Sequence, residues 1–158
     1  MVVQIPESDI ASLPTMEVVR STNRDWFLSE LIRMANATQS EFGITLSVSG
    51  LIVSGNVISG VKYFESFAEN FQVFAGDDEE FQSQLKEYIL DMGSVYKTSA
   101  DEEKEYGPET LPQFIHLSSA KFYKNGVGPL PSNGMLWRGN LDEVSGFTLG
   151  RLEEMDGE

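Results

Sequence analysis

The sequence predicts one α+β domain in which a helix precedes an antiparallel sheet and a helical insertion interrupts that sheet. Three observations predict this class. Apolar residues recur at helical spacing near residue 30, alternate with polar residues between 43 and 58, and return to helical spacing from 61 to 97 before further strand patterns. With 158 residues, 41% of them hydrophobic, the chain is long enough to bury one sizeable core.

The same patterns predict the organisation along the chain. Residues 1–21 contain two prolines and no sustained period, so we expect a flexible N-terminal arm. A single domain is expected over 22–152, with the helical insertion at about 61–110. The last residues, 153–158, are rich in carboxylates and are expected to form an acidic tail.

The first helix is expected over residues 24–40, where apolar residues follow one another every three to four positions. Its apolar side is broad enough to lie across a sheet. Thr22 and Asp25 fit a capping box at its start, with Asn23 as an alternative cap.

Residues 43–59 predict a β-hairpin. Ser49-Gly50 fits a two-residue turn that pairs Val48 with Leu51, and this register places the aliphatic residues of both strands on one face. Those residues are Phe42, Ile44, Leu46, Val48, Leu51, Val53 and Val57. The outer face is expected to be small and hydroxylated, with Thr45, Ser47, Ser49 and Ser54. Gly55 inside the second strand predicts a bend or bulge.

Two helices are expected in the insertion, over 61–73 and, after Gly76, over 77–97. Asp77 and Glu80 give a capping signature for the second helix. The first helix carries four phenylalanines at helical spacing: Phe64, Phe67, Phe71 and Phe74. A lone helix cannot bury all four. They are core residues if the helix docks on the sheet, and a partner surface if it does not. The charged segment that follows, 101–109, is expected to be a mobile connector.

The last third returns to strand patterns. Residues 114–123 predict a strand pair or one bent strand, and 125–134 predict a long loop because of their glycines and prolines. Further strands are expected over 135–141 and 144–152. This order of elements fits a small, strongly bent barrel of the Sm-like kind, preceded by a helix, and it also fits an open α+β sandwich. The sequence leaves both layouts open.

Composition excludes most kinds of chemistry. Eleven Lys and Arg residues against 25 Asp and Glu give a net charge of −14, which repels nucleic acids and anionic lipid surfaces. The absence of cysteine and the single histidine exclude disulfides, thiol catalysis and the common zinc sites. No segment predicts a signal peptide or a membrane helix. We therefore expect a cytoplasmic protein with no metal, no cofactor, no nucleic acid partner and no membrane partner.

No pattern predicts an enzyme. His116 lies in a strand pattern without a carboxylate nearby in the sequence, so we interpret it as a packing or surface residue. The acidic residues crowd helix starts and termini, where solvated charge accounts for them. A nucleophile motif and a phosphate-binding loop are both absent from the sequence.

The strongest candidate for an interaction site is the Trp-Arg-Gly-Asn sequence at 137–140, because tryptophan and arginine are favoured at the hot spots of protein interfaces. In the alternative interpretation, Trp137 fills the core and Arg138 pairs with Asp142 or Glu143. The candidate interaction residues are therefore Trp137, Arg138, Gly139 and Asn140, together with Phe64, Phe67 and Phe71 of the insertion.

Two stretches also carry a family resemblance. The sequences GITLSVSGLIVSGNVISGVKYF, residues 43–64, and FIHLSSAKFYKNGVGPLPSNGMLWRGNLDEVSGFTLGRL, residues 114–152, resemble the GvpU family of gas vesicle accessory proteins. The resemblance implies a non-enzymatic cytoplasmic protein that helps gas vesicles assemble or sets how finished vesicles associate. It brings no catalytic residues. Gas vesicle structural or accessory proteins are the implied partners, and we expect self-association through a sheet edge or through the strand at 137–140.

Two other classes of function remain open at this point. An acidic immunity or inhibitor protein would neutralise a basic toxin or nuclease, and the net charge of −14 suits that role. Such a mimic should concentrate its acids on one rigid face, whereas many of them lie here at helix starts and tails. A carboxylate-based hydrolase is a more distant third.

Overall fold

The computed structural model describes residues 24–97 and 111–152, and the expected arm, charged connector and acidic tail lie outside these residues. The helices are α3 (Trp26–Thr38), α4 (Gly60–Phe71) and α5 (Glu79–Met92), with short 3-10 segments η1 (Gln72–Ala75), η2 (Gly93–Tyr96) and η4 (Leu141–Glu143). The strands are β1 (Phe42–Val48), β2 (Leu51–Ile58), β3 (Phe114–Lys124), β4 (Val127–Asn140) and β5 (Val144–Leu149).

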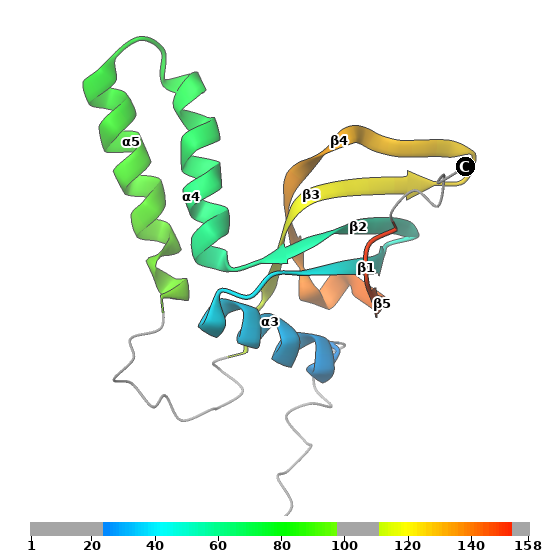
Figure 1. Cartoon of the computed structure of the whole chain (residues 1–158). Coiled ribbons are helices and arrows are strands. Elements are labelled where there is room, and N and C mark those ends of the chain that lie inside the picture. Colours follow the sequence, from blue (N-terminus) through cyan, green and yellow to red (C-terminus); the bar gives the residue numbers. More distant parts are fainter. Residues whose placement is uncertain (1–23, 98–110, 153–158) are drawn as a thin grey trace, which may run out of the picture.

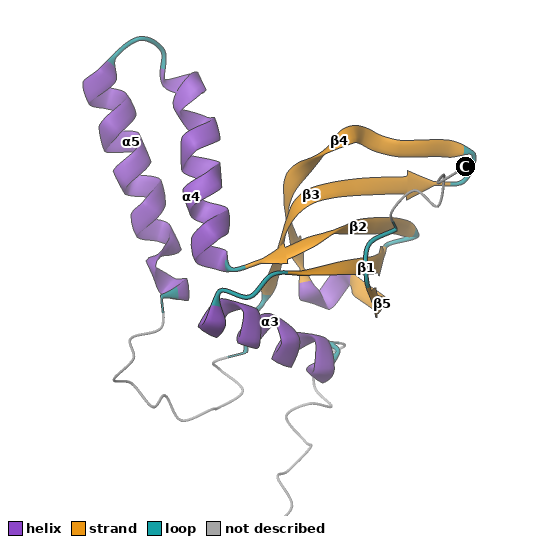
Figure 2. Ribbon diagram, in the orientation of Figure 1, coloured by secondary structure: helices purple, strands orange, loops and turns teal. Residues whose placement is uncertain are grey.

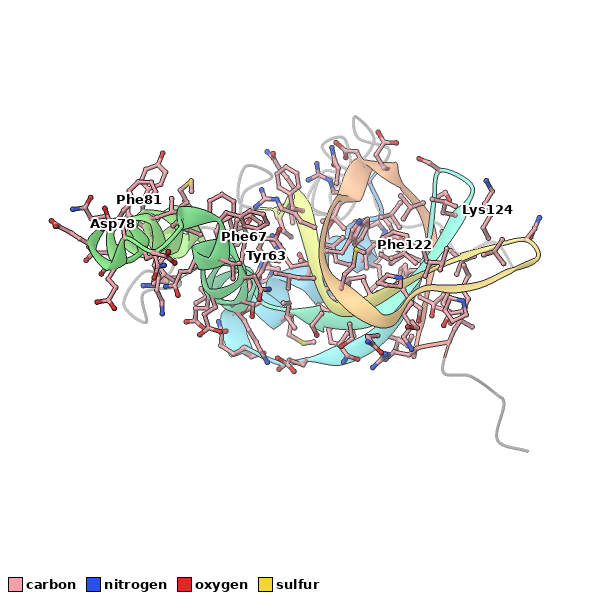
Figure 3. All side chains as sticks on the ribbon, turned by 90° about the horizontal axis from the view of Figure 1, so that it is seen from above. Tyr63, Phe67, Asp78, Phe81, Phe122 and Lys124 are labelled. Atoms are coloured by element: carbon pink, nitrogen blue, oxygen red, sulfur yellow. The ribbon has the colours of Figure 1, made fainter. Side chains whose placement is uncertain are left out.

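The five strands form one antiparallel sheet in the order β4-β3-β2-β1-β5 (Figure 1). The two outermost strands, β4 and β5, are joined by the three residues of η4. So short a link can connect opposite edges only if the sheet curls, and Figure 3 shows the curled sheet from above. The α+β class is therefore confirmed, and the strongly bent layout describes the sheet better than an open sandwich does.

The β1-β2 hairpin has the predicted register. Val48 pairs with Leu51 across the Ser49-Gly50 turn, and Ile44 pairs with Gly55. The pairing of β2 with β3 shifts register at Gly55, as expected of a bulge, and a Cβ at this position would lie 2.9 Å from the Ser118 carbonyl oxygen. The aliphatic residues of the hairpin form the centre of a core to which β3, η4 and β5 contribute.

Helix α3 closes the core from one side of the sheet (Figure 2). Its buried apolar residues, Leu28, Ile32 and Ala35, recur at helical spacing and pack against the aliphatic face of the sheet. Asp25 is the N-cap, because its carboxylate accepts hydrogen bonds from the backbone N–H groups of Phe27 (2.8 Å) and Leu28 (3.2 Å). The predicted capping box, which placed Asp25 inside the first turn, is therefore wrong, and Thr22 and Asn23 lie outside the described residues.

The long loop predicted at 125–134 is wrong. Only a tight turn with Gly126 at a φ of 76° separates β3 from β4, and the rest of the segment is strand. The prolines suggested a loop, but β4 is an edge strand, and an edge strand tolerates residues that lack an N–H donor. Residues 114–123 belong to one bent strand, whose pairing shifts register between Leu117 and Ala120.

The hydroxylated face of the hairpin is partly covered, contrary to its prediction as an outer face. Thr45 and Ser54 are buried, and their hydroxyl oxygens lie 3.1 Å apart. The Thr45 hydroxyl donates to the Gly150 carbonyl (2.8 Å), and the Ser54 hydroxyl accepts from the Leu152 N–H (2.8 Å). The chain after β5 thus folds back over this face.

Replacing Ser54 with alanine is expected to lower the free energy of unfolding by about 1 kcal/mol, because the Leu152 N–H and the Thr45 hydroxyl both lose a partner. Urea titration measures the change. Ser47→Ala is the matched control, since the Ser47 hydroxyl bonds the exposed Ser145 hydroxyl. Equal losses in the two variants would contradict the role of Ser54.

Candidate functional site

The helical insertion is a hairpin of α4 and α5 that projects away from the sheet (Figure 1). Helix α4 begins directly after β2. The Ser59 side chain caps it by accepting from the Lys62 N–H (3.1 Å), and the Asn36 side chain of α3 accepts from the Gly60 N–H (2.9 Å). The start of the hairpin is thereby tied to both the sheet and α3.

Helix α5 runs back towards the sheet from the tip of the hairpin. Its N-cap is Asp78, whose carboxylate accepts from the Phe81 N–H (3.1 Å). The predicted signature with Asp77 as the cap is wrong by one residue, because the helix begins at Glu79 and the cap must directly precede it. The two acids of the first turn, Glu79 and Glu80, face the positive end of the helix dipole.

At its base the hairpin is locked by two glycines, each of which lies against an aromatic ring. Gly60 at the start of α4 lies under the Tyr96 ring, and Gly93 at the end of α5 lies under Phe64. A Cβ at Gly93 would be 2.6 Å from the Phe64 Cβ. The Phe64 and Tyr96 rings are stacked with their centroids 6.0 Å apart. Any larger residue at either glycine would force the base of the hairpin apart.

His116 on β3 lies at this junction and is fully buried. Aromatic rings surround it: its centroid is 4.6 Å from that of Tyr63, 5.2 Å from Tyr96 and 6.3 Å from Phe64. Neither ring nitrogen has a hydrogen-bond partner in the described part of the chain. Burial, and secondly the positive charge of Arg138, lower the pKa of His116 to about 3. The imidazole is therefore a neutral packing residue of the junction.

Arg138 on β4 reaches the same junction. Its guanidinium lies 3.9 Å from the centroid of the Phe114 ring and 5.6 Å from that of Phe64, both cation–π distances. The alternative interpretation, in which Arg138 pairs with Asp142 or Glu143, is wrong on this point. Asp142 pairs instead with Arg24 at 3.0 Å, because η4 turns its side chain towards the start of α3.

The other three residues of the 137–140 candidate have different roles. Trp137 packs against the core beside Phe122, with ring centroids 6.1 Å apart. Its indole lies over Gly139, where a Cβ would collide with the ring. The Asn140 side chain caps η4 by accepting from the Asp142 N–H (2.9 Å). The structure thus brings Arg138 together with Phe64 and places Trp137 apart from them.

One side of the hairpin is lined by apolar side chains, all exposed except the half-buried Phe71, and we call it the aromatic face. Phe67 and Phe71 of α4 contact each other, as do Phe71 and Phe74, each pair with centroids 5.5 Å apart. The α5 residues at helical spacing, Phe81, Tyr88 and Met92, lie on the corresponding side of that helix and are exposed. Figure 3 looks down on the hairpin and labels Phe67 and Phe81. The aromatic face comprises Phe67, Phe71, Phe74, Phe81, Tyr88 and Met92.

The opposite side of the hairpin is a shallow groove of mixed charge. The groove is lined by two carboxylates of α4, one lysine of α5 and one lysine after η2, so it carries two negative and two positive charges. The lining residues are Val61, Glu65, Glu69, Lys86, Leu90, Gly93 and Lys97. Helical spacing places this set away from the aromatic face, and the two sides therefore differ sharply in polarity.

The sequence predicts only part of the aromatic face. It points to Phe67 and Phe71 as interaction candidates, whereas Phe81, Tyr88 and Met92 are recognisable from it only as one face of a helix. The missing information is the pairing of the two helices, which places both apolar rows on the same side. Aromatic residues repeated at helical spacing in two successive helices are the signal that points to such a face.

Comparison with protein families identifies the chain. The model of the family described as gas vesicle protein GvpU-like matches residues 25–152. This chain belongs to the GvpU-like family. The match begins at the N-cap of α3 and ends at Leu152, so it includes the bent sheet, the α4–α5 hairpin and the aromatic face. It confirms the resemblance and makes the chain a gas vesicle-related protein.

No curated protein and no solved structure matches the chain. Among the described residues of this GvpU-like protein, no helix is both long and apolar enough to cross a membrane. The same residues contain no group of three or more His, Cys, Asp or Glu side chains placed to hold a metal ion.

Proposed function

We propose that this GvpU-like protein is a non-enzymatic accessory protein of the cytoplasm that assists gas vesicle assembly or controls how vesicles cluster. It acts through contacts with gas vesicle proteins and through self-association. The observation that carries the proposal is the exposed aromatic face of the α4–α5 hairpin. This hairpin projects away from the sheet (Figure 1).

Exposed aromatic side chains on this scale favour a binding surface. Phe74 is 80% exposed, Tyr88 65% and Phe81 50%. Contiguous apolar patches of more than a few hundred Å² are uncommon on monomeric proteins and mark sites of interaction. A partner that covers the face removes apolar surface from water, and each Å² removed contributes about 25 cal/mol to the binding free energy. The partner can therefore bind there without a charged contact.

Co-flotation with purified gas vesicles tests the proposal. Full-length protein is mixed with intact vesicles, the vesicles are floated, and the buoyant layer is probed for the protein. We expect the wild-type protein in that layer, even at high salt, because the apolar contact is not screened by ions. The Phe74→Ser/Tyr88→Ser variant is expected to lose most of this binding or of the vesicle clustering that accompanies it.

The control replaces exposed apolar residues of the sheet, in the variant Val127→Ser/Leu130→Ser, which should float and cluster like wild type. A folded wild-type protein that is absent from the buoyant layer and has no effect on assembly in cells would contradict the accessory role. That result would favour the acidic inhibitor of a basic partner.

A further inference from the structure

The occupant of the aromatic face follows from its area, its charge and its shape. The side chains of Phe67, Phe74, Phe81, Tyr88 and Met92 are 36%, 80%, 50%, 65% and 45% exposed. At about 200 Å² for each fully exposed side chain, they present about 500 Å² of apolar surface. A stable interface buries about 800 Å² on each partner, so these five residues supply most of one.

Charge favours a second copy of the chain on this face. Two molecules that each carry a net charge of −14 repel one another, and they can approach most closely where carboxylates are absent. The aromatic face consists of six uncharged side chains, whereas a contact on the opposite side of the hairpin would desolvate four charges, those of Glu65, Glu69, Lys86 and Lys97. The aromatic face is thus where two copies can meet at low electrostatic cost.

The ends of the hairpin differ in charge, and this difference selects an orientation. The tip carries Asp77, Asp78, Glu79 and Glu80. The described part of the base has no such run of acids: Lys97, on the groove side, directly follows η2, and Arg138 lies over Phe64. Parallel packing of two hairpins would bring the two acidic tips together. Antiparallel packing places the two acidic tips at opposite ends of the contact, each beside a base that has no such run of acids.

We infer that two copies of this chain pack aromatic face to aromatic face, with their hairpins antiparallel, in a closed four-helix contact. The inference rests on the proposed function and names one of its partners. A two-fold contact of this kind uses the same patch on both copies, so it saturates at two chains and does not extend into a filament. The two sheets then lie at opposite ends of the pair.

Light scattering coupled to size-exclusion chromatography, at about 10–100 µM full-length protein, tests the inference. We expect a mass twice the 17.6 kDa of one chain. Phe74→Glu, at the tip, and Tyr88→Lys, nearer the base, should each weaken the dimer at least about 100-fold, because each places two charges in a desolvated contact. Val127→Glu replaces an apolar residue of β4 that is 50% exposed, and this control should leave the mass unchanged.

Mixing the two variants tests the antiparallel arrangement. A Phe74→Glu chain and a Tyr88→Lys chain should form a heterodimer, because one end of the contact then joins opposite charges and the other end is native. A monomeric wild type, or a dimer that survives both single substitutions in folded protein, overturns the inference. A monomer that still floats with vesicles would leave the proposed function standing, and a dimer that never associates with vesicles would contradict that function alone.

Discussion

The Gly93→Val variant is expected to be about 3 kcal/mol less stable than wild type, because valine cannot fit beneath Phe64. The first added carbon would lie 2.6 Å from the Phe64 Cβ, which is fixed to the backbone of α4 and cannot swing aside. Overpacking of this kind costs about 1–3 kcal/mol, and the branched side chain brings it to the upper end. Urea titration followed by circular dichroism measures the loss.

Two controls accompany this variant. At Gly146 on β5 an added Cβ would meet no heavy atom within 4 Å, so Gly146→Val should change stability by less than about 0.5 kcal/mol. Adding Phe64→Ala to Gly93→Val should cost less than the sum of the two single substitutions, since alanine keeps the Cβ but removes the ring atoms at 2.9 and 3.2 Å and so relieves part of the collision. A Gly93→Val protein as stable as wild type would show that the hairpin is not locked at its base.

Stability is expected to fall by about 2 kcal/mol between pH 7.5 and pH 5.0 through His116 alone. The pKa of this histidine is about 3 in the folded protein and 6.5 at its ordinary value. Between pH 6.5 and pH 3 the imidazole of the unfolded chain binds a proton that the imidazole of the folded chain does not. The contribution of the neutral His116 to the free energy of unfolding is therefore fully present above pH 6.5 and is lost as the pH falls towards 3. Unfolding curves at the two pH values measure it.

His116→Phe is the matched variant, because it keeps an aromatic ring among Tyr63, Phe64 and Tyr96 but cannot take up a proton. The chain has no other histidine, so the difference between wild type and this variant isolates one group. The variant should lose about 2 kcal/mol less than wild type over the same interval. Identical pH dependence in both proteins would contradict the burial of a neutral imidazole at the junction.

Both experiments probe the place where the hairpin meets the sheet, and that place decides how the aromatic face is presented. Tyr63 links the junction to the face, since its ring contacts both His116 and Phe67. A variant that loosens the junction while the protein stays folded should therefore weaken self-association as well.

Local patterns in the sequence determined the framework of this protein. The alternation around Ser49-Gly50 predicted the hairpin and its register, because the side chains of a strand alternate with a period of two and a slip by one residue would expose the core. Helical spacing predicted α3, α4 and α5, because apolar residues that recur every three to four positions share one face of a helix. The resemblance to GvpU rested on residues 43–64, which include the hairpin, and on residues 114–152, and the family match covers both stretches.

Only the tertiary structure decided what the edges, the junction and the hairpin do. The prolines of 125–134 are compatible with a strand because β4 has a neighbour on one side alone, which no local pattern reveals. Trp137 and Arg138 are adjacent in sequence but separated in space, since successive side chains of a strand point to opposite faces. The aromatic face exists because two helices pair, and pairing depends on contacts between residues distant in the chain. Local periodicity fixes which side of a helix is apolar, whereas packing decides which apolar sides are covered.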